Sequence, residues 1–253
     1  MKQLILGLPL DALTMDDVLD RCRGSLTTRE RTLVGVVNAA KMVRLRHDTH
    51  LRDSLLECDV LLADGQSVVW ASRLLRRRLP ERVAGIDLFE RLLELAARDG
   101  WSVYLLGARP DVLATLQQRL GERFPALKIA GARDGYFAGT EGSSVAADIR
   151  QSGADMLFLG MTSPKKEIFL GDYGATLGAP VLHGVGGSFD ILAGITKRAP
   201  VRWQRLGLEW LYRVLQEPRR LWRRYLTTNA TFIALVLREL VWRQPPYQHS
   251  SGD

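Results

Sequence analysis

Short β-branched runs alternate with helical patterns along most of this chain, and this alternation limits the fold more strongly than any other feature of the sequence. It extends from about Leu33 to Val185 and is typical of parallel βαβ units. We therefore predict an α/β fold with a mainly parallel sheet and flanking helices. The expected strands cover residues 33–37, 59–63, 102–106, 127–130, 156–159 and 181–182. The expected helices cover residues 39–46, 67–77, 86–98 and 143–150, and others begin after Thr14, at Pro110 and at Ser163-Pro164.

Polar residues and glycines follow these strands directly. The strand ends carry Asn38, Asp64-Gly65, Gly107, Asp134-Gly135, Gly160 and the turn 184–187. Because ligands of open parallel sheets bind outside the carboxyl ends of the strands, we expect the functional site at this edge. Asp64 is either a turn residue, since Asp-Gly is a frequent turn pair, or a general base held at the mouth of a cleft. Its position alone leaves both interpretations open.

The glycine turn Gly184-Val185-Gly186-Gly187 gives a ligand close access to backbone N–H groups. The dinucleotide fingerprint GxGxxG fails here because Phe189 occupies the place of the third glycine, and no P-loop motif occurs. The histidines are scattered, so a structural metal site has no support. We predict neither a cofactor nor a metal. The two cysteines, Cys22 and Cys58, are expected to be buried free thiols.

The positive charge of the chain is concentrated near its C-terminus. The net charge is +7 at pH 7, and residues 197–243 contain eleven Lys or Arg residues against three acids, so residues 1–196 are neutral overall. Arginines and aromatic residues are interleaved in this segment, which suits phosphate contact or a membrane interface. A solvated basic face is the simpler alternative. We expect an interfacial appendage that includes an apolar helix over residues 228–242.

The N-terminal segment is predicted to be a first strand and not a signal peptide, because Asp11, Asp16 and Asp17 follow it and no small-residue cleavage site appears. No uncharged apolar stretch reaches the roughly 18 residues that a membrane-spanning helix needs.

Several motifs, in order along the chain, carry a resemblance to a known family. The chain resembles the WecG/TagA/CpsF family of bacterial glycosyltransferases from about Leu33 to Tyr225. The matching motifs are residues 63–65, 82–87, 135–137, Gly160 with Pro164-Lys165 and Glu167, 184–190, 197–200, 207–210 and 217–220.

This resemblance implies a Rossmann-like fold and an inverting glycosyltransferase. Members of the family transfer a sugar from a UDP-sugar to a polyprenyl-diphosphate-linked acceptor at the cytoplasmic face of the membrane, in exopolysaccharide or cell-envelope polymer synthesis. UDP-glucose, UDP-N-acetylmannosamine and its uronic acid are candidate donors. The expected organisation is a catalytic domain over residues 1–196, a basic, aromatic, membrane-associating helical appendage over residues 197–243 and a flexible tail over residues 244–253. The protein is expected to be cytoplasmic and peripheral at the inner face of the cell membrane.

The resemblance also assigns roles to single residues. Asp64 takes the role of the catalytic base, and negative charge on the departing UDP would be stabilised by backbone N–H groups and arginines in place of a metal. Arg213, Arg220 and Arg224 would address a diphosphate. The chain departs from the family in having Val36 and Val37 where Thr or Pro often precedes the asparagine, and Lys166 where a Gln is usual. The expected substrate-binding residues are Asn38, Arg82, Asp87, Gly107, Gly160, Lys166, Glu167, Gly186, Gly187, Asp190, Arg213, Arg220 and Arg224.

Two other functional classes remain as alternatives. A non-catalytic phosphate-binding module for RNA or anionic lipid would use the same basic segment and would bind any polyanion with a steep dependence on salt. Because residues 1–196 are neutral and contain no recognisable RNA-reading motif, we expect no nucleic-acid partner. A sugar-nucleotide hydrolase or epimerase on a similar scaffold would turn over UDP-sugar without a lipid acceptor.

Overall fold

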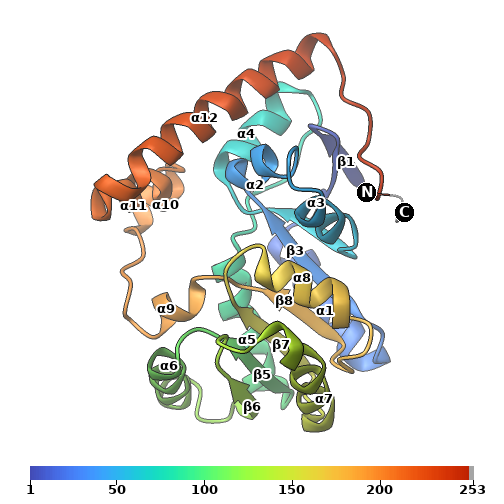
Figure 1. Ribbon diagram of the computed structural model, residues 1–253, viewed down its shortest axis with the longest axis vertical. Helices are drawn as coiled ribbons and strands as arrows, with labels where there is room; N and C mark the ends of the chain where they lie inside the picture. Colours follow the sequence, from blue (N-terminus) through green and yellow to red (C-terminus); the bar gives the residue numbers. More distant parts are fainter. Residues whose placement is uncertain (251–253) are drawn as a thin grey trace.

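The computed structural model describes residues 1–250, and for Arg205, Arg213, Arg220 and Arg224 it describes the backbone without the side chain. A six-stranded sheet with the strand order β4-β3-β8-β7-β5-β6 forms its centre (Figure 1). Every neighbouring pair in this sheet is parallel, so the predicted α/β fold with a parallel sheet is confirmed. The strands are β3 (Thr32–Val37), β4 (Val60–Ala63), β5 (Ser102–Gly107), β6 (Lys128–Arg133), β7 (Met156–Gly160) and β8 (Val181–Gly184).

The expected first strand exists, but it pairs outside the main sheet. β1 (Lys2–Ile5) and β2 (Leu8–Asp11) form an antiparallel hairpin. Leu6 and Gly7 both have positive φ, as a two-residue turn of the primed type requires. The buried Asp11 accepts a hydrogen bond from the amide of Leu61 at 2.9 Å, which attaches the hairpin to β4.

The two faces of the sheet carry separate hydrophobic cores. Leu33 and Leu157 belong to one core while their neighbours Val34 and Phe158 belong to the other, as the two-residue period of a strand requires. The second core is covered by α1 (Met15–Thr28), α5 (Gly85–Asp99) and α6 (Pro110–Arg123). The first is covered by α2 (Ala39–Arg44), α3 (Thr49–Leu56), α4 (Gln66–Leu74), α7 (Gly142–Ser152) and α8 (Lys165–Tyr173), with the short η1 (Gly139–Glu141) before α7.

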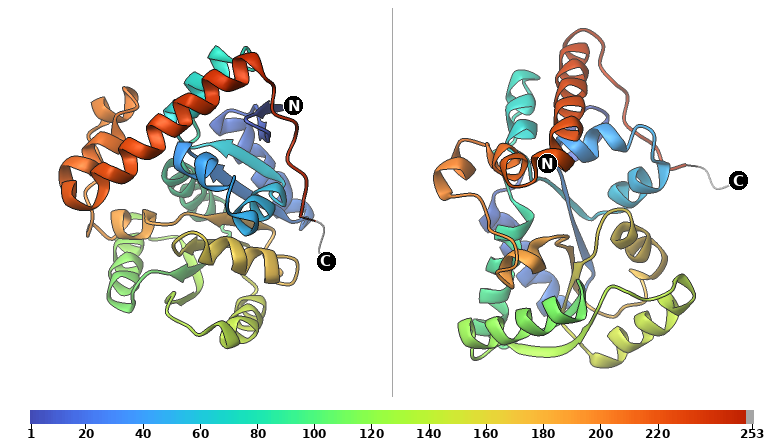
Figure 2. Two further views of the ribbon diagram at one scale, coloured as in Figure 1. Left: turned by 45° about the horizontal axis from the view of Figure 1, so that its top comes forward. Right: turned by 60° about the vertical axis from the view of Figure 1, so that its left-hand side comes forward.

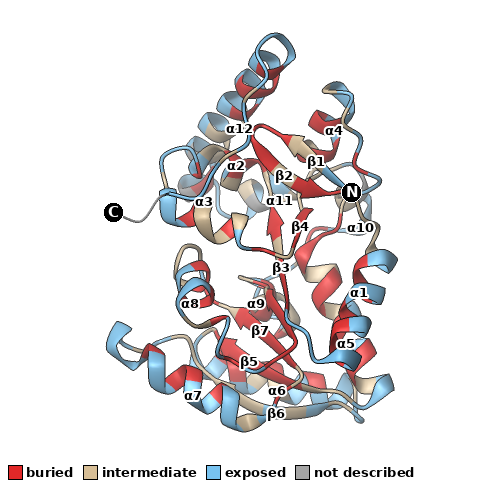
Figure 3. Cartoon of the chain, turned by 90° about the vertical axis from the view of Figure 1, so that its right-hand side faces the viewer, coloured by how far each residue is buried: buried red, intermediate tan, exposed pale blue. Residues whose placement is uncertain are grey.

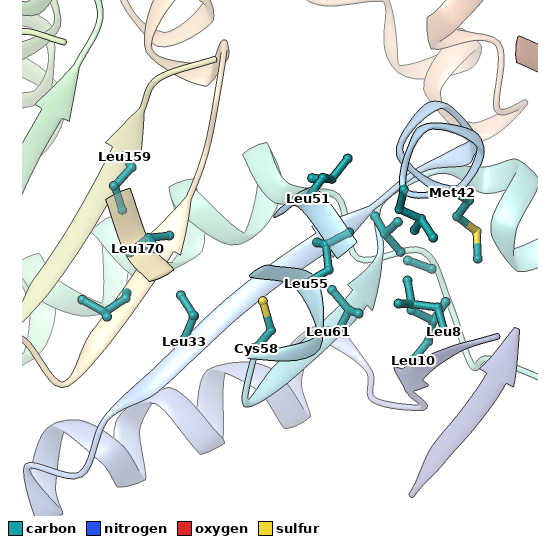
Figure 4. Close-up of a cluster of buried hydrophobic side chains, with 14 of the residues drawn as sticks. Leu8, Leu10, Leu33, Met42, Leu51, Leu55, Cys58, Leu61, Leu159 and Leu170 are labelled. Atoms are coloured by element: carbon teal, nitrogen blue, oxygen red, sulfur yellow. The ribbon is translucent and has the colours of Figure 1, made fainter. Parts of the chain in front are cut away.

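Figure 3 shows that the central strands are buried almost throughout and that the exposed residues lie on the outer faces of the helices. Figure 4 shows part of the first core, where Leu33 and Leu61 of the sheet meet Leu51 and Leu55 of α3. Cys58 lies in the same cluster. Cys22 and Cys58 are both buried and free, as expected, and burial raises the pKa of each thiol to about 12.

The C-terminal part of the described chain is helical. It contains α9 (Ser188–Leu192), α10 (Val201–Arg205), α11 (Glu209–Gln216) and α12 (Pro218–Val241), and α12 packs against α2 and α11. Phe232 and Val236 of α12 are buried in the first core. Within the described residues, no helix is long and apolar enough to span a bilayer.

Residues 244–250 run back past the N-terminal hairpin (Figure 1). The amide of Tyr247 donates to the carbonyl oxygen of Gly7 at 2.8 Å, and the Arg52 guanidinium donates to Ser250 Oγ at 3.0 Å. The division into a domain over residues 1–196, an appendage over residues 197–243 and a tail from residue 244 stays a prediction.

Candidate functional site

A cleft of about 630 Å³ opens at the carboxyl ends of β4, β3 and β8. These three strands are neighbours in the sheet, so the residues that follow them converge at one edge. The walls of the cleft come from α4 on one side and from α11 and α12 on the other. Five of the predicted site residues line it: Asn38, Asp64, Arg82, Lys166 and Gly187.

Asp64 directly follows β4, and its carboxylate is held in a fixed position. Its backbone amide donates to the carbonyl oxygen of Val37 at 2.9 Å, which continues the pairing with β3. Its Oδ1 accepts from the amide of Gly85, the first residue of α5, at 3.0 Å. No described residue donates a hydrogen bond to Oδ2. The side chain is therefore oriented through Oδ1.

Asn38 and Gly65 bring two strand ends close together. Asn38 caps α2, because its Oδ1 accepts from the amide of Lys41 at 3.1 Å. A Cβ atom at Gly65 would lie only 3.2 Å from the Cβ of Asn38, so the absence of a side chain permits this approach. The Asp-Gly pair thus acts both as the turn between β4 and α4 and as part of the cleft.

A cluster of buried charges forms the base of the cleft. Lys41 Nζ and Lys166 Nζ lie 3.4 and 3.5 Å from Oε1 of Glu167. Neither carboxylate oxygen of Glu167 accepts a directed hydrogen bond from the described residues, so the attraction is that of an ion pair. Burial lowers the pKa of Lys166 to about 8, and the ammonium of Lys41 acts in the same direction. Two cations share the Glu167 carboxylate, so this cluster carries one positive charge, which faces the carboxylate of Asp64.

Glu167 follows Lys166 in α8, and it is one of the buried charged residues of the protein. Burial raises the pKa of its carboxyl group, but the two lysine ammonium groups outweigh this effect, so that the pKa lies below its ordinary value. Lys166 itself crosses the glycine turn. A Cβ at Gly184 would lie 3.1 Å from the Lys166 side chain, so this glycine accommodates the lysine.

A second charged network closes the cleft on the side of α11. Arg82 Nη1 donates to Glu209 Oε2 at 2.8 Å, and Arg198 Nη1 lies 2.6 Å from Asp87 Oδ1. Longer contacts, 3.8 Å from Arg82 to Asp87 and 3.7 Å from Arg198 to Glu209, complete it. Burial lowers the pKa of Arg198, but its acidic neighbours outweigh burial and raise the pKa above its ordinary value. The network fastens α11 to the start of α5.

His183 of β8 lies beneath the cleft and is fully buried. Its Nδ1 is 3.0 Å from the carbonyl oxygen of Val34, and its Nε2 is 3.1 Å from that of Gly85. Burial lowers the pKa of this imidazole. The two carbonyl contacts favour the charged form and raise the pKa, but the effect of burial is larger. His183 thus ties β3 to the residue that orients Asp64.

Several predicted residues do not line the cleft. A Cβ at Gly107 would lie 2.5 Å from the backbone of Gly160, and one at Gly160 would lie 2.3 Å from the Phe189 ring, so both glycines permit close packing. Gly186 has a φ of 55°, which favours glycine. The carbonyl oxygen of Asp190 accepts from the amides of Ile195 and Thr196. The side chains of Arg213, Arg220 and Arg224 lie outside the described residues.

Three residues of the site were not predicted from the sequence: Lys41, Arg198 and Glu209. Arg198 and Glu209 nevertheless lie in the motifs 197–200 and 207–210. Lys41 lies three residues after Asn38, in the first turn of the helix that follows the strand end. This spacing is the sequence signal that could have identified it as a site residue. No three His, Cys, Asp or Glu side chains in the described part of the chain are grouped as ligands for a metal ion. The charges that face the cleft can instead hold an anionic ligand.

The sequence was also compared with known protein families. The sequence profile of the glycosyl transferase WecG/TagA/CpsF family matches residues 3–246.

Proposed function

The chain belongs to the WecG/TagA/CpsF family of glycosyl transferases, and we propose that it transfers a hexose with inversion from a UDP-sugar to a polyprenyl-diphosphate-linked sugar. The family makes it a glycosyltransferase of cell-envelope polymer synthesis. Glucose, N-acetylmannosamine and its uronic acid are the candidate sugars, and exopolysaccharide is a candidate product.

The observation that carries the proposal is the Asp64 carboxylate in the cleft. Gly85 holds its Oδ1, while Oδ2 has no donor among the described residues. A carboxylate oriented in this way is suited to accept the proton of the acceptor hydroxyl. As that proton moves to Asp64, the hydroxyl oxygen bonds to the anomeric carbon and the bond from this carbon to the UDP oxygen breaks. The leaving group then carries the displaced electron pair.

The cationic groups around the cleft support the departure of UDP. Lys166, Arg82 and Arg198 line it, and each is largely buried, with 10%, 14% and 21% of the side chain exposed. Fixed cations in a partly dehydrated site stabilise developing negative charge more strongly than water-exposed cations do. The remaining predicted binding residues keep their proposed roles, including the three arginines whose side chains are not described.

The position of α11 and α12 supports a peripheral location at the inner face of the membrane. Trp222, Leu226 and Trp242 are exposed on α12 or directly after it, and Leu215 is exposed on α11. Exposed aromatic and apolar side chains beside arginines suit the boundary between headgroups and acyl chains. We therefore retain residues 197–243 as a membrane-associating appendage to a catalytic domain of residues 1–196, followed by a tail.

The test is product mass spectrometry with a panel of UDP-sugars and a short-chain prenyl-diphosphate-linked monosaccharide. Asp64→Asn is compared with Asp59→Asn, because Asp59 directly precedes β4 and Asp64 directly follows it. Wild type and Asp59→Asn should form a lipid-linked disaccharide from one donor, and Asp64→Asn should lose about 10²-fold or more of the rate. Release of free sugar without a disaccharide would indicate a hydrolase. Absence of turnover together with binding to anionic vesicles or RNA would favour the phosphate-binding module.

A further inference from the structure

The cleft continues from Asp64 outward between α4 and α12, where Trp70, Leu74, Ile233 and Leu237 line it. We propose that this α4–α12 groove binds the first isoprene units of the acceptor's polyprenyl chain. The inference rests on the proposed function, because it concerns the acceptor of the same reaction. Both views of Figure 2 show α4 and α12 side by side.

On α4, the residues that line the cleft change from polar to apolar with distance from Asp64. Gln66 and Ser67 begin the helix, and Trp70 and Leu74 follow at intervals of three or four residues, so that they share one face. Trp70 is 50% exposed and Leu74 is 54% exposed. The helix is about 13 Å long, so the groove accommodates only the first few isoprene units.

On α12, the same change occurs along a single stripe. Tyr225, Asn229, Ile233 and Leu237 line the cleft at intervals of four residues, which places them on one face of the helix. The first two side chains carry polar groups and the last two are aliphatic. Ile233 and Leu237 are both more than half exposed. The walls formed by α4 and α12 are therefore both polar near Asp64 and apolar farther from it.

This gradient matches an amphiphile with its charged head at the strand ends and its apolar chain in the groove. The head, which carries the acceptor hydroxyl, would lie at the Asp64 end of the cleft, while the chain would remove the exposed apolar side chains of both walls from water. Arg73, Arg76 and Arg78 are exposed at the far end of α4. Such a basic rim suits the anionic surface of a bilayer, toward which the rest of the chain would lead.

The experiment measures kcat/KM for acceptors that differ only in the number of isoprene units, in the absence of a bilayer. For wild type, kcat/KM should rise over the first units and then level off. The informative quantity is kcat/KM for the long acceptor divided by kcat/KM for the shortest acceptor. Leu237→Asn and Leu74→Asn should each reduce this ratio by about tenfold. Both side chains are half exposed, so neither substitution should unfold the protein. A thermal melt verifies this.

Leu240→Asn is the matched control. Leu240 lies on α12, is 49% exposed and does not line the cleft, so the ratio should stay at its wild-type value. The inference is overturned if wild type shows no dependence on chain length, or if the control loses as much as Leu237→Asn. In these cases transfer to the shortest acceptor would still support the proposed function. Absence of transfer to every acceptor would overturn the proposed function and the inference with it.

Discussion

The carbonyl oxygen of Gly85 lies 3.1 Å from Nε2 of His183, and the amide of the same glycine donates to Asp64 Oδ1 at 3.0 Å. The other imidazole nitrogen contacts the carbonyl oxygen of Val34 at 3.0 Å. A buried side chain on β8 therefore contacts the residue whose amide orients the proposed base, which directly follows β4. Space is limited at this point, because a Cβ on Gly85 would lie 3.2 Å from Val36.

Removal of the imidazole should disturb both folding and the first step of the reaction. The neutral imidazole has one N–H and donates to only one of the two carbonyl oxygens, so in His183→Leu one buried carbonyl group loses its donor, which should reduce the free energy of unfolding by about 1–3 kcal/mol. We expect kcat to fall more than KM rises, because Asp64 loses its orientation. His183→Gln retains an amide donor and should recover part of both losses. Urea unfolding and initial rates measure the two effects, and an unchanged kcat for folded His183→Leu would refute the positioning role.

The same histidine predicts a dependence of stability on pH. Burial holds its pKa below the ordinary value, so the folded protein keeps the imidazole neutral where the unfolded chain already binds a proton. Stability is therefore lost as the pH falls below about 6.5, with a slope of at most about 1.4 kcal/mol per pH unit from this group. Urea titrations at pH 7.0 and 5.5 should give a smaller difference for His183→Gln than for wild type. Equal differences would exclude His183 as the source.

Much of the fold follows from local sequence patterns, and the exceptions have physical causes. Most strands of the sheet were predictable because each is a short apolar run that ends in or before Asp, Asn or Gly, and Asp64 and Asn38 at those ends line the cleft. The exception is β6, which begins with Lys128, ends with Arg133 and extends beyond the expected end at residue 130. The helix α3 was missed because it is short and only Leu51, Leu55 and Leu56 within it are apolar, with Asp48 as its start signal. The predicted helix at 67–77 ends earlier, at Leu74, since Arg76 adopts a positive φ.

Contacts between distant segments could not be predicted from the sequence. Asp11 bonds to Leu61, fifty residues away, and this contact places the hairpin beside β4 rather than in the parallel sheet. Glu167 stands next to Lys166 in the chain, but its pairing with Lys41 depends on how α2 and α8 pack on one face of the sheet. The roles predicted for Gly107, Gly160, Gly186 and Asp190 stay predictions.

Lys166 should make the affinity for UDP depend on pH. Burial lowers its pKa to about 8, so the ammonium is present at neutral pH and is lost as the pH rises through this value. A bound anion favours the charged form and would raise this pKa. We expect the Kd for UDP, measured by calorimetry, to be higher at pH 9 than at pH 7. Lys166→Gln should bind about tenfold more weakly at pH 7 and show little further change at pH 9. Lys128→Gln, on the edge strand β6, is the control, and its Kd for UDP should equal that of wild type at both pH values. A Kd for Lys166→Gln equal to that of wild type would contradict a contact between Lys166 and UDP.

The ion pair between Arg82 and Glu209 should stabilise the attachment of α11 more than an exposed ion pair with the same N–O distance would. Its atoms are 2.8 Å apart and the side chains are 14% and 28% exposed, whereas Arg109 and Asp111 form a pair of the same length with 59% and 65% exposed. Solvent screens the pair of Arg109 and Asp111 more strongly. A double-mutant cycle in the free energy of unfolding should therefore give a coupling energy of about 1–2 kcal/mol for Arg82 with Glu209, and below about 0.5 kcal/mol for Arg109 with Asp111. Substitution of each residue by Gln supplies both cycles. Equal couplings would show that burial by α11 adds nothing to the pair.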